Sequence, residues 1–353
     1  MKTALQKHSK LNDDDHVYYD VTFYNNSLNP LPLNIIDSRT LPLIKKPSDY
    51  HLSIIRFNLP SSYLPIFIWP ATNPNSTYSV TIYYNGLYYQ SYLHYVPYNN
   101  LATTAPNYYF VYSYQQLIDA INNAFNSAYI ASGASPATQP PYIIFNPVTG
   151  LFSLIAEQNY DSTTGTYRVY MNQPLFAFFD NFPNIMNSPF PQAGGTDYQL
   201  LIKNTGNFVA SNAPGYSSSI STTLNAYEII QENYTLYLIN SVRKVIITSS
   251  IPIITENLNI ADQQLTTTTN NTLKILTDFE VNLSNADWRS YIQYVPLGEY
   301  RLITMNGDTP LYQFDFSILF QTADQTIYQM YINGGEVFSM KTLFRDKNFK
   351  SSL

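Results

Sequence analysis

The sequence predicts an all-β protein, a β-sandwich or jelly roll, with a segment in its middle that carries at least one helix. Runs of β-branched and aromatic residues recur along the chain, with Gly, Pro and Asn turn signals between them. One stretch in the first half has helical spacing instead. The length of 353 residues allows one large or two medium domains. Antiparallel strands with regular turns are typical of a sandwich or jelly roll.

Four runs with the residue pattern of a strand lie near the beginning of the chain. These runs lie at residues 17–24, 50–58, 76–86 and 87–96. Asn85 and Gly86 separate the last two runs, and this pair is a strong signal for a two-residue hairpin turn. We therefore expect residues 76–96 to form a β-hairpin.

The run YHLSIIRFN at residues 50–58 is expected to be a central strand of the sandwich. Strict alternation places Tyr50, Leu52, Ile54 and Arg56 on one face and the residues between them on the other. Both faces are mostly apolar, which indicates a strand that is covered on both sides. Pro47 and Pro60 flank it, as expected for residues that cannot donate to a central ladder.

Strand signals return in the last third of the chain. They lie at residues 235–239, 243–254, 274–283, 300–305, 312–321, 326–332 and 336–345. Asn306-Gly307 and Asn333-Gly334-Gly335 supply turns between them. This order is that of an antiparallel sandwich.

The middle of the chain has a different pattern. Apolar residues at helical spacing predict a helix over 113–130, with Ser113 as N-cap and Gln116 three residues further on. Residues 142–156 are expected to form a hairpin, residues 167–182 a strand followed by a short helical or irregular apolar stretch, and residues 187–225 long loops.

These patterns divide the chain into five parts. We expect a flexible arm at 1–16, the first part of the jelly roll at 17–98, an insertion at 99–225, the second part of the jelly roll at 226–347 and a short basic tail at 348–353.

The composition points towards assembly rather than catalysis. Charged residues make up only 12% of the chain, whereas tyrosine occurs 33 times. Tyrosine buries a large ring and still offers a hydroxyl group, so a surface rich in it suits contact with other subunits. The net charge of −6 argues against specific nucleic-acid binding, and the absence of cysteine excludes disulfides and thiolate metal sites. No stretch is long and apolar enough to span a membrane.

A search for catalytic motifs finds none, so no enzymatic activity, cofactor or metal is expected. No nucleophile elbow accompanies His51 or His94, and the sequence has no phosphate-binding loop. Two carboxylates across a cleft could cleave sugars, and the acids within strand-like runs are Asp278, Glu280, Asp315 and Glu336. Their spacing alone cannot pair them.

Cationic residues in or beside the strands are better candidates for a functional role. Seven stand out: Arg39, Lys45, Lys46, Arg56, Arg289, Arg301 and Arg345. In a chain so poor in charge, they suit fixed ion pairs at contacts between subunits. Pairing within the chain, with Asp37, Asp49 or Asp315, is the equally weighted alternative.

Several blocks of the sequence resemble, in order, the minor capsid (penton) proteins of virophages, Maverick/Polinton elements and polinton-like viruses. The blocks are DSRTLPLIKKPSDYHLSIIRFNLPSSYLPIF, SYQQLIDAINNAFNSAY, PPYIIFNPVTGLFSL, ILTDFEVNL, YVPLGEYRLITMNGDTPLYQFDFSILFQ and GGEVFSMKTLFRDK. Together they span most of residues 17–347, whereas the loops at 187–225 and 256–273 match nothing in the family.

The resemblance implies a structural protein of the virion that is made and assembled inside an infected host cell. Such pentons are similar to single jelly-roll proteins, which implies a single jelly-roll β-sandwich with an inserted segment that carries at least one helix. They form homopentamers at the icosahedral fivefold vertices, among trimers of the double jelly-roll major capsid protein, and can receive a vertex spike or a host receptor. The resemblance supplies no catalytic residues.

Two other classes of protein stay open on the sequence alone. A carbohydrate-binding or carbohydrate-cleaving jelly roll would bind glycans as a monomer. A receptor-binding spike would form trimers and expose residues 99–225.

Overall fold

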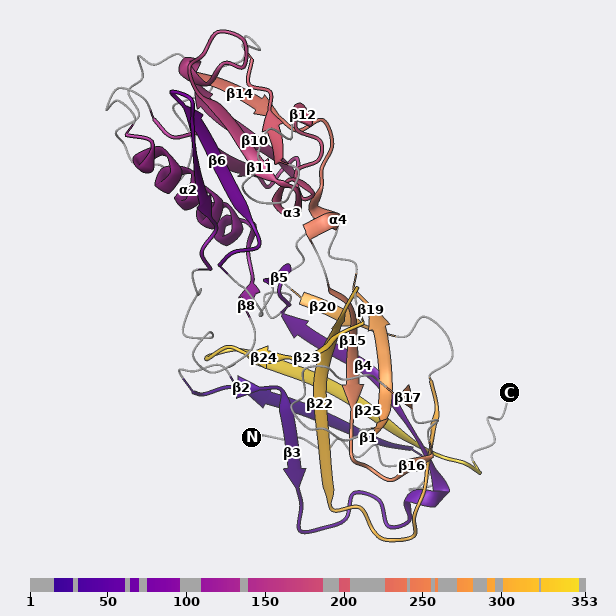
Figure 1. Ribbon diagram of the computed structural model, residues 1–353. Helices are drawn as coiled ribbons and strands as arrows, with labels where there is room; N and C mark the ends of the chain where they lie inside the picture. Colours follow the sequence, from indigo (N-terminus) through magenta and orange to yellow (C-terminus); the bar gives the residue numbers. More distant parts are fainter. Residues whose placement is uncertain are drawn as a thin grey trace. The chain divides into compact units, whose positions relative to one another are not determined.

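The structure is a computed structural model in which two parts of the chain fold as separate compact units (Figure 1). It describes residues 16–27, 31–60, 64–69, 75–95, 109–133, 139–186, 197–203, 226–239, 242–254, 258–259, 272–281, 291–295, 301–323 and 325–348. The expected arm and tail lie outside these ranges, apart from His16 and Asn348.

Unit 1 comprises residues 1–64, 242–282 and 287–353, and unit 2 comprises residues 65–241 and 283–286. The insertion therefore begins at Pro65 and ends at Ser241, whereas the sequence pattern placed it at 99–225. The difference arises because the hairpin at 79–92 has the alternation of a sandwich strand pair, yet its strands belong to a sheet of unit 2. Alternation of apolar and polar residues indicates that one face of a strand is buried, but it does not indicate which sheet the strand joins.

Unit 1 is built from two antiparallel sheets. The first sheet contains β1 (His16–Tyr24), β4 (Tyr50–Pro60), β16 (Ile253–Ile254), β20 (Tyr291–Tyr294), β21 (Ile303–Met305) and β25 (Val337–Asp346). The second contains β3 (Asn34–Ser38), β15 (Val242–Thr248), β19 (Ile275–Glu280), β22 (Gln313–Thr322) and β23 (Ile327–Gln329). Smaller elements are the pairs β2 (Leu31–Pro32) with β24 (Tyr331–Ile332) and β17 (Leu258–Asn259) with β18 (Thr272–Leu273), and the 3₁₀ helix η1 (Pro47–Asp49).

The pairing of the long strands is that of a jelly roll. If β20 and β21 count as one interrupted strand, the order along the chain is β1, β3, β4, β15, β19, β20/β21, β22 and β25. The first strand then pairs with the eighth, the second with the seventh, the third with the sixth and the fourth with the fifth. This is the result of rolling one long antiparallel ribbon into two sheets. The predicted fold class is therefore confirmed, and unit 2 is inserted between the third and fourth strands.

Aromatic side chains fill the space between the two sheets of unit 1. Tyr19 of β1 contacts Phe314 of β22, with ring centroids 5.2 Å apart, and Phe57 of β4 lies 5.3 Å from Phe279 of β19. Phe344 of β25 packs edge-on against Phe314 as well. Each contact joins one sheet to the other, so burial of these rings holds the sandwich together.

A β-bulge in β4 corrects the predicted alternation. Arg56 pairs with Lys341, but the next partner, Thr342, pairs with Ile54, so Ile55 is the extra residue. A bulge reverses which face the following residues occupy. Leu52 and Phe57 consequently both point into the core, whereas strict alternation placed them on opposite faces.

Unit 2 contains two larger sheets and the long helix. The five-stranded sheet has the order β12 (Asn184–Met186), β13 (Asp197–Leu200), β11 (Arg168–Asn172), β6 (Ser79–Tyr84) and β7 (Leu87–Tyr92). The three-stranded sheet has the order β14 (Ala226–Ile230), β10 (Leu151–Glu157) and β9 (Tyr142–Asn146). The other elements are the pair β5 (Phe67–Trp69) and β8 (Tyr109–Val111), the helices α2 (Tyr114–Ala131), α3 (Gln173–Phe176) and α4 (Leu236–Ile239), and the 3₁₀ helix η3 (Gln158–Tyr160).

Helix α2 begins where the sequence predicts. The hydroxyl of Ser113 accepts a hydrogen bond from the backbone N–H of Gln116 at 3.1 Å. The side chain of Gln116 accepts in turn from the N–H of Tyr112 at 3.0 Å, one residue before the cap. This reciprocal arrangement satisfies backbone donors that the first turn leaves unpaired.

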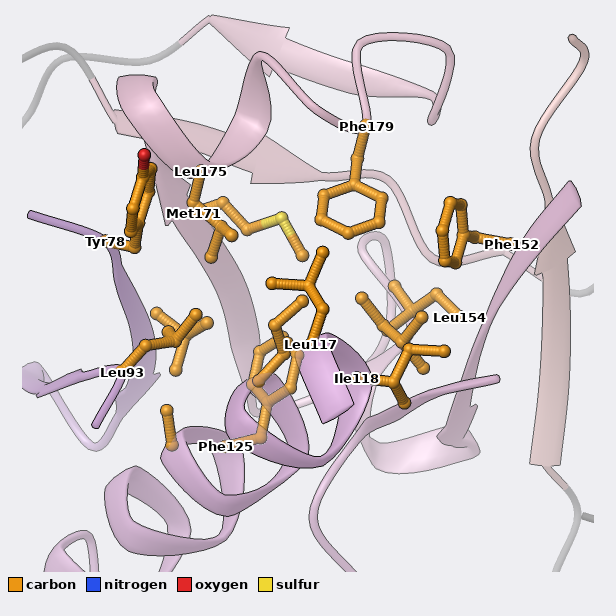
Figure 2. Packing of buried hydrophobic residues seen from close by; sticks show 14 of the residues in the cluster. Tyr78, Leu93, Leu117, Ile118, Phe125, Phe152, Leu154, Met171, Leu175 and Phe179 are labelled. Atoms are coloured by element: carbon orange, nitrogen blue, oxygen red, sulfur yellow. The ribbon is translucent and has the colours of Figure 1, made fainter. Parts of the chain in front are cut away.

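The core of unit 2 lies between α2 and the two sheets (Figure 2). Leu117, Ile118 and Phe125 of α2 point towards Phe152 and Leu154 of β10 and towards Met171 of β11, and all are at most 1% exposed. Every residue of this cluster lies between Ile66 and Ile239, so unit 2 has a hydrophobic core of its own.

Two predicted elements differ in kind. Residues 236–239 form α4 instead of a strand, because Leu236 and Ile239 lie three apart and both are buried, which a helical turn allows. The region expected to be loops at 187–225 contains β13, whose four residues DYQL carry too little pattern to indicate a strand.

Candidate functional site: charged clusters of the jelly roll

Arg39 lies at an internal ion pair that joins the two sheets of unit 1. Its Nε donates a hydrogen bond to Asp37 Oδ2 at 3.0 Å, and its guanidinium lies 5.0 Å from the ring centroid of Tyr19. The Tyr19 hydroxyl donates to the same carboxylate oxygen. Tyr19 belongs to β1 and Asp37 to β3, so the cluster connects the first and second sheets.

This cluster is largely shielded from solvent. The side chains of Arg39 and Asp37 are 20% and 12% exposed. Burial, together with the hydrogen bond to Asp37 and its negative charge, holds the pKa of Tyr19 far above its ordinary value, so the hydroxyl stays a donor. Arg39 therefore stabilises the fold, and its expected role at a subunit contact stays a prediction.

Arg56 lies on the outward face of the first sheet, in a cluster with Asp20 and Lys341. The register places these three residues side by side on β1, β25 and β4. Arg56 Nη2 lies 3.6 Å from Asp20 Oδ1, and Lys341 Nζ lies 3.5 Å from Asp20 Oδ2. One carboxylate faces two cations, which leaves a net positive charge on this face. The Arg56 side chain is 50% exposed.

Arg345 lies further along the same outward face, in a row with two histidines. The register pairs it with His16 on one side and His51 on the other. Burial and the charges of Lys347 and Arg345 lower the pKa of His51. The row therefore extends the cationic character of this face towards the end of β25, and we call the surface formed by Arg56, Lys341 and Arg345 the cationic face.

Arg301 belongs to a second shared ion pair, on the outward face of the second sheet. Its Nη1 donates to Asp278 at 2.7 Å, and Lys244 Nζ lies 3.4 Å from the other carboxylate oxygen. Burial alone would raise the pKa of Asp278, but the hydrogen bonds and charges of Arg301 and Lys244 outweigh it and lower the pKa. A carboxylate held ionised is a poor general acid, which argues against that one of the two glycosidase roles at this residue.

The remaining candidates lie near the turn before β4 or outside the described residues. Lys46 Nζ lies 3.3 Å from Asp49 and 3.8 Å from Asp308, and its side chain is 53% exposed. Lys45 is exposed. Asp315, an expected partner, instead accepts hydrogen bonds from Ser249 and Ser250. Arg289 lies outside the described residues.

Sequence reasoning missed Asp20, Lys341 and Lys244 as partners in these clusters. Alternation in residues 17–24 could have shown that Asp20 points away from the core, because Tyr19 and Val21 are apolar neighbours. The strand order, however, cannot be read from alternation. It decides that Asp20 meets Lys341 and Arg56 rather than other cations.

Two features are absent from the described ranges. These ranges contain no group of three or more His, Cys, Asp and Glu residues that could hold a metal ion. No helix in this part of the chain is long and apolar enough to cross a membrane.

The jelly roll of unit 1 places this chain in a class of β-sandwich proteins that includes viral capsid proteins, lectins and cupins. The family model of the Sputnik minor capsid protein V18/19 matches residues 17–346. The chain belongs to this family, which confirms the resemblance seen in the sequence. It is therefore a minor capsid protein, a structural component of the virion.

Two curated proteins of the Sputnik virophage are similar to this chain. The uncharacterized protein V18 is 33% identical over 157 residues, which are 37% of this chain and 92% of V18. The structural protein V19 is 29% identical over 216 residues, which are 58% of this chain and 94% of V19.

Two solved structures share the fold. A chain in the cryo-EM structure of the Sputnik virophage superposes with a TM-score of 0.71 and 27% identity, covering 94% of this chain and 98% of that one. The mavirus penton protein superposes with a TM-score of 0.62 over 94% of this chain and 99% of its own. At 16% identity the second likeness concerns the fold alone.

Proposed function

We propose that this chain is the penton of an icosahedral virion, and that five copies close a ring at each fivefold vertex beside double jelly-roll major capsid proteins. The observation that carries the proposal is the superposition on a chain of the Sputnik virion, at a TM-score of 0.71 over 94% of this chain. The shared fold with a protein named as a penton, from mavirus, supports the same role.

A ring of five requires a heterologous contact, in which one surface of each copy meets a different surface of the next. The cationic face is a suitable half of such a contact, because the single carboxylate of Asp20 is shared by two cations, Arg56 and Lys341. Arg56 and Arg345 are the predicted interface residues on it. A carboxylate of the neighbouring copy would complete the pairing that Asp20 leaves incomplete.

The other partners follow from the same role. We propose contacts with major capsid protein trimers, assembly inside the infected host cell, and a purely structural role without enzymatic activity. A vertex spike or a host receptor is a further partner of such a ring. The family match does not favour a carbohydrate-active jelly roll or a trimeric spike.

The native mass of the recombinant chain, measured together with negative-stain images of the same sample, tests the proposal. A mass of five chains with fivefold rings is expected. If the chain is a monomer alone, mixing it with the major capsid protein should produce particles that carry it at the vertices. A stable dimer or trimer, or particles with empty vertices, would contradict the proposal.

A further inference from the structure

The hairpin of β6 and β7 in unit 2 ends in an edge strand that contains no charge. Its turn residues Asn85 and Gly86 have φ values of +49° and +79°, the two positive values of a type I′ turn. The segment Ser79–Tyr92 contains no Asp, Glu, Lys, Arg or Pro. β7 is the last strand of the five-stranded sheet, so one side of it has no neighbouring strand among the described residues.

The register identifies the backbone groups on that open side. A two-residue turn makes Tyr84 and Leu87 a hydrogen-bonded pair, so every second residue after Leu87 faces β6. The bond from Leu93 N–H to the carbonyl of Tyr78, at 2.8 Å, continues this alternation. The backbone groups of Gln90 and Tyr92 therefore point away from β6, and no described residue pairs with them there.

Other sheet edges of unit 2 carry the protection that proteins normally give to edge strands. On β9, the side-chain amide of Asn122 in α2 bonds both backbone groups of Ile143, at 2.7 and 2.9 Å, and so occupies the edge. β12 has only three residues, and β14 carries the charged residue Glu228. β7 has six residues and none of these devices.

We infer that the open edge of β7 is a docking site for an extended polypeptide segment of another protein, which adds as a sixth strand. Main-chain hydrogen bonds to Gln90 and Tyr92 supply the attraction, as in other cases of strand addition. This inference does not depend on the fivefold ring, because a strand can add to a monomer.

The charge of unit 2 defines the chemistry of the partner. Its 181 residues contain seven Asp and Glu against two Lys and Arg, a net charge of −5 out of the total −6. This negative charge repels an acidic strand and attracts a basic one, so we infer that the partner segment is basic. Tyr88 and Tyr92, 39% and 36% exposed, offer it aromatic surface on one face of the sheet.

A second copy of β7 is a poor occupant of this edge, because both copies of unit 2 carry the same net charge of −5. Pairing β7 with β7 also requires a twofold axis, and such a contact closes at two chains. We therefore assign the edge to a segment of another protein.

The probe for the test is a synthetic peptide that copies β6, Ser79–Tyr84, with lysines added at both ends for solubility. β6 is the strand with which β7 already pairs on its other side. Amide hydrogen exchange of the full chain is measured with and without the peptide. The amides of Gln90 and Tyr92 should exchange at least about tenfold more slowly with the peptide bound. A peptide N-methylated at alternate residues, with the same charge, should give no protection.

Two variants separate edge pairing from other effects. Gln90→Pro removes the outward N–H but no bond to β6, whereas Gln90→Ala loses the same side-chain bond to Ser79 and keeps the N–H. Protection of Tyr92 by the peptide should persist in Gln90→Ala and disappear in Gln90→Pro. The inference is overturned by a lack of protection in the unmodified chain or by equal protection in both variants. It is overturned also if the free chain forms a dimer that Gln90→Pro alone abolishes. The ring itself is tested by native mass, so the two failures are distinguishable.

Discussion

The two units of this protein place their charged and aromatic residues differently. Unit 1 contains 16 of the 18 Lys and Arg residues, and several of its described cations, among them Arg39, Arg56 and Arg301, form ion pairs on and between the two sheets. Unit 2 contains 22 of the 33 tyrosines and only two cations. The jelly roll thus uses fixed charges at its surfaces, whereas the insertion relies on aromatic burial and on amide and hydroxyl hydrogen bonds.

From this difference we infer that the two units contact other molecules in different ways. Ion pairs that share one carboxylate between two cations leave charge available for a charged partner, as on the cationic face. An uncharged strand edge instead attracts a backbone. We expect the jelly roll to supply the contacts of the ring and the insertion to receive other proteins.

The largest expected effect comes from removing an aromatic side chain at the centre of unit 2. Phe125→Ala should lower the unfolding free energy of unit 2 by about 4 kcal/mol, because the ring is fully buried in the hydrophobic core of this unit. Hydrogen exchange read by mass spectrometry should show lost protection in unit 2 and unchanged protection in unit 1. Ile130→Ala, at a 67% exposed position of the same helix, is the control. Equal loss in both units would show that they unfold together.

A somewhat smaller effect is expected at the internal ion pair of unit 1. Asp37→Ala leaves the Arg39 guanidinium and the Tyr19 hydroxyl without their acceptor, which should cost about 3 kcal/mol. The same exchange measurement should now show the loss in unit 1. Asp308→Ala, which removes an 80% exposed carboxylate near Lys46, should change stability by less than about 0.5 kcal/mol. An unfolding free energy unchanged in Asp37→Ala would show that the cluster does not hold the sheets together.

The sequence was sufficient for the fold class because the strands of unit 1 are long and their turns carry clear signals. It was sufficient for α2 too, where eighteen residues keep helical spacing behind a Ser113 cap. Short elements were not predictable. Four residues at Leu236–Ile239 fit a strand or a helical turn, and burial of the first and last decides for the helix.

The charged clusters were only partly predictable. Arg39 and its partner Asp37 lie two residues apart, so the sequence could offer this pair as one of two equally weighted alternatives. The meeting of Asp20 with Arg56 depends on β25 lying between β1 and β4, which pairs the beginning of the chain with its end. The bulge at Ile55 could not be predicted from the sequence either, because no residue type indicates it. It follows only from the register of β4 against β25. Local pattern determines which face a side chain occupies, whereas long-range pairing determines its neighbours.

A smaller effect is expected from acid, which should change the contributions of two carboxylates, one in each unit, to stability in opposite directions. The pKa of Asp278 in unit 1 is lowered in the folded state, so its contribution is present above the unfolded value of about 3.9 and is lost as the pH falls below it. Burial raises the pKa of Asp197 in unit 2, so burying its charge costs stability at neutral pH and this cost disappears in acid.

Urea unfolding of the unmodified chain, Asp278→Asn and Asp197→Asn at pH 7 and between pH 3 and 5 measures this response. Asp197→Asn should stabilise the protein at pH 7 and lose that advantage as the pH falls. Asp278→Asn should destabilise it at pH 7 and remove part of its acid sensitivity. The same sign of change in both variants would show that the two carboxylates experience similar environments.

The smallest effect on stability is expected for a substitution of Arg56, whose proposed effect is on the formation of the ring. Arg56 is half exposed and Asp20 keeps Lys341 as a partner, so Arg56→Gln should change the unfolding free energy by no more than about 0.5 kcal/mol. If the cationic face meets the next copy, the same variant should raise the concentration needed for half-maximal ring formation by roughly tenfold. Arg243→Gln, at an exposed position of β15 in the second sheet and outside the cationic face, is the control. Analytical ultracentrifugation over a concentration series measures both variants. Identical assembly curves would remove Arg56 from the interface and leave its ion pair with a role in the sheet alone.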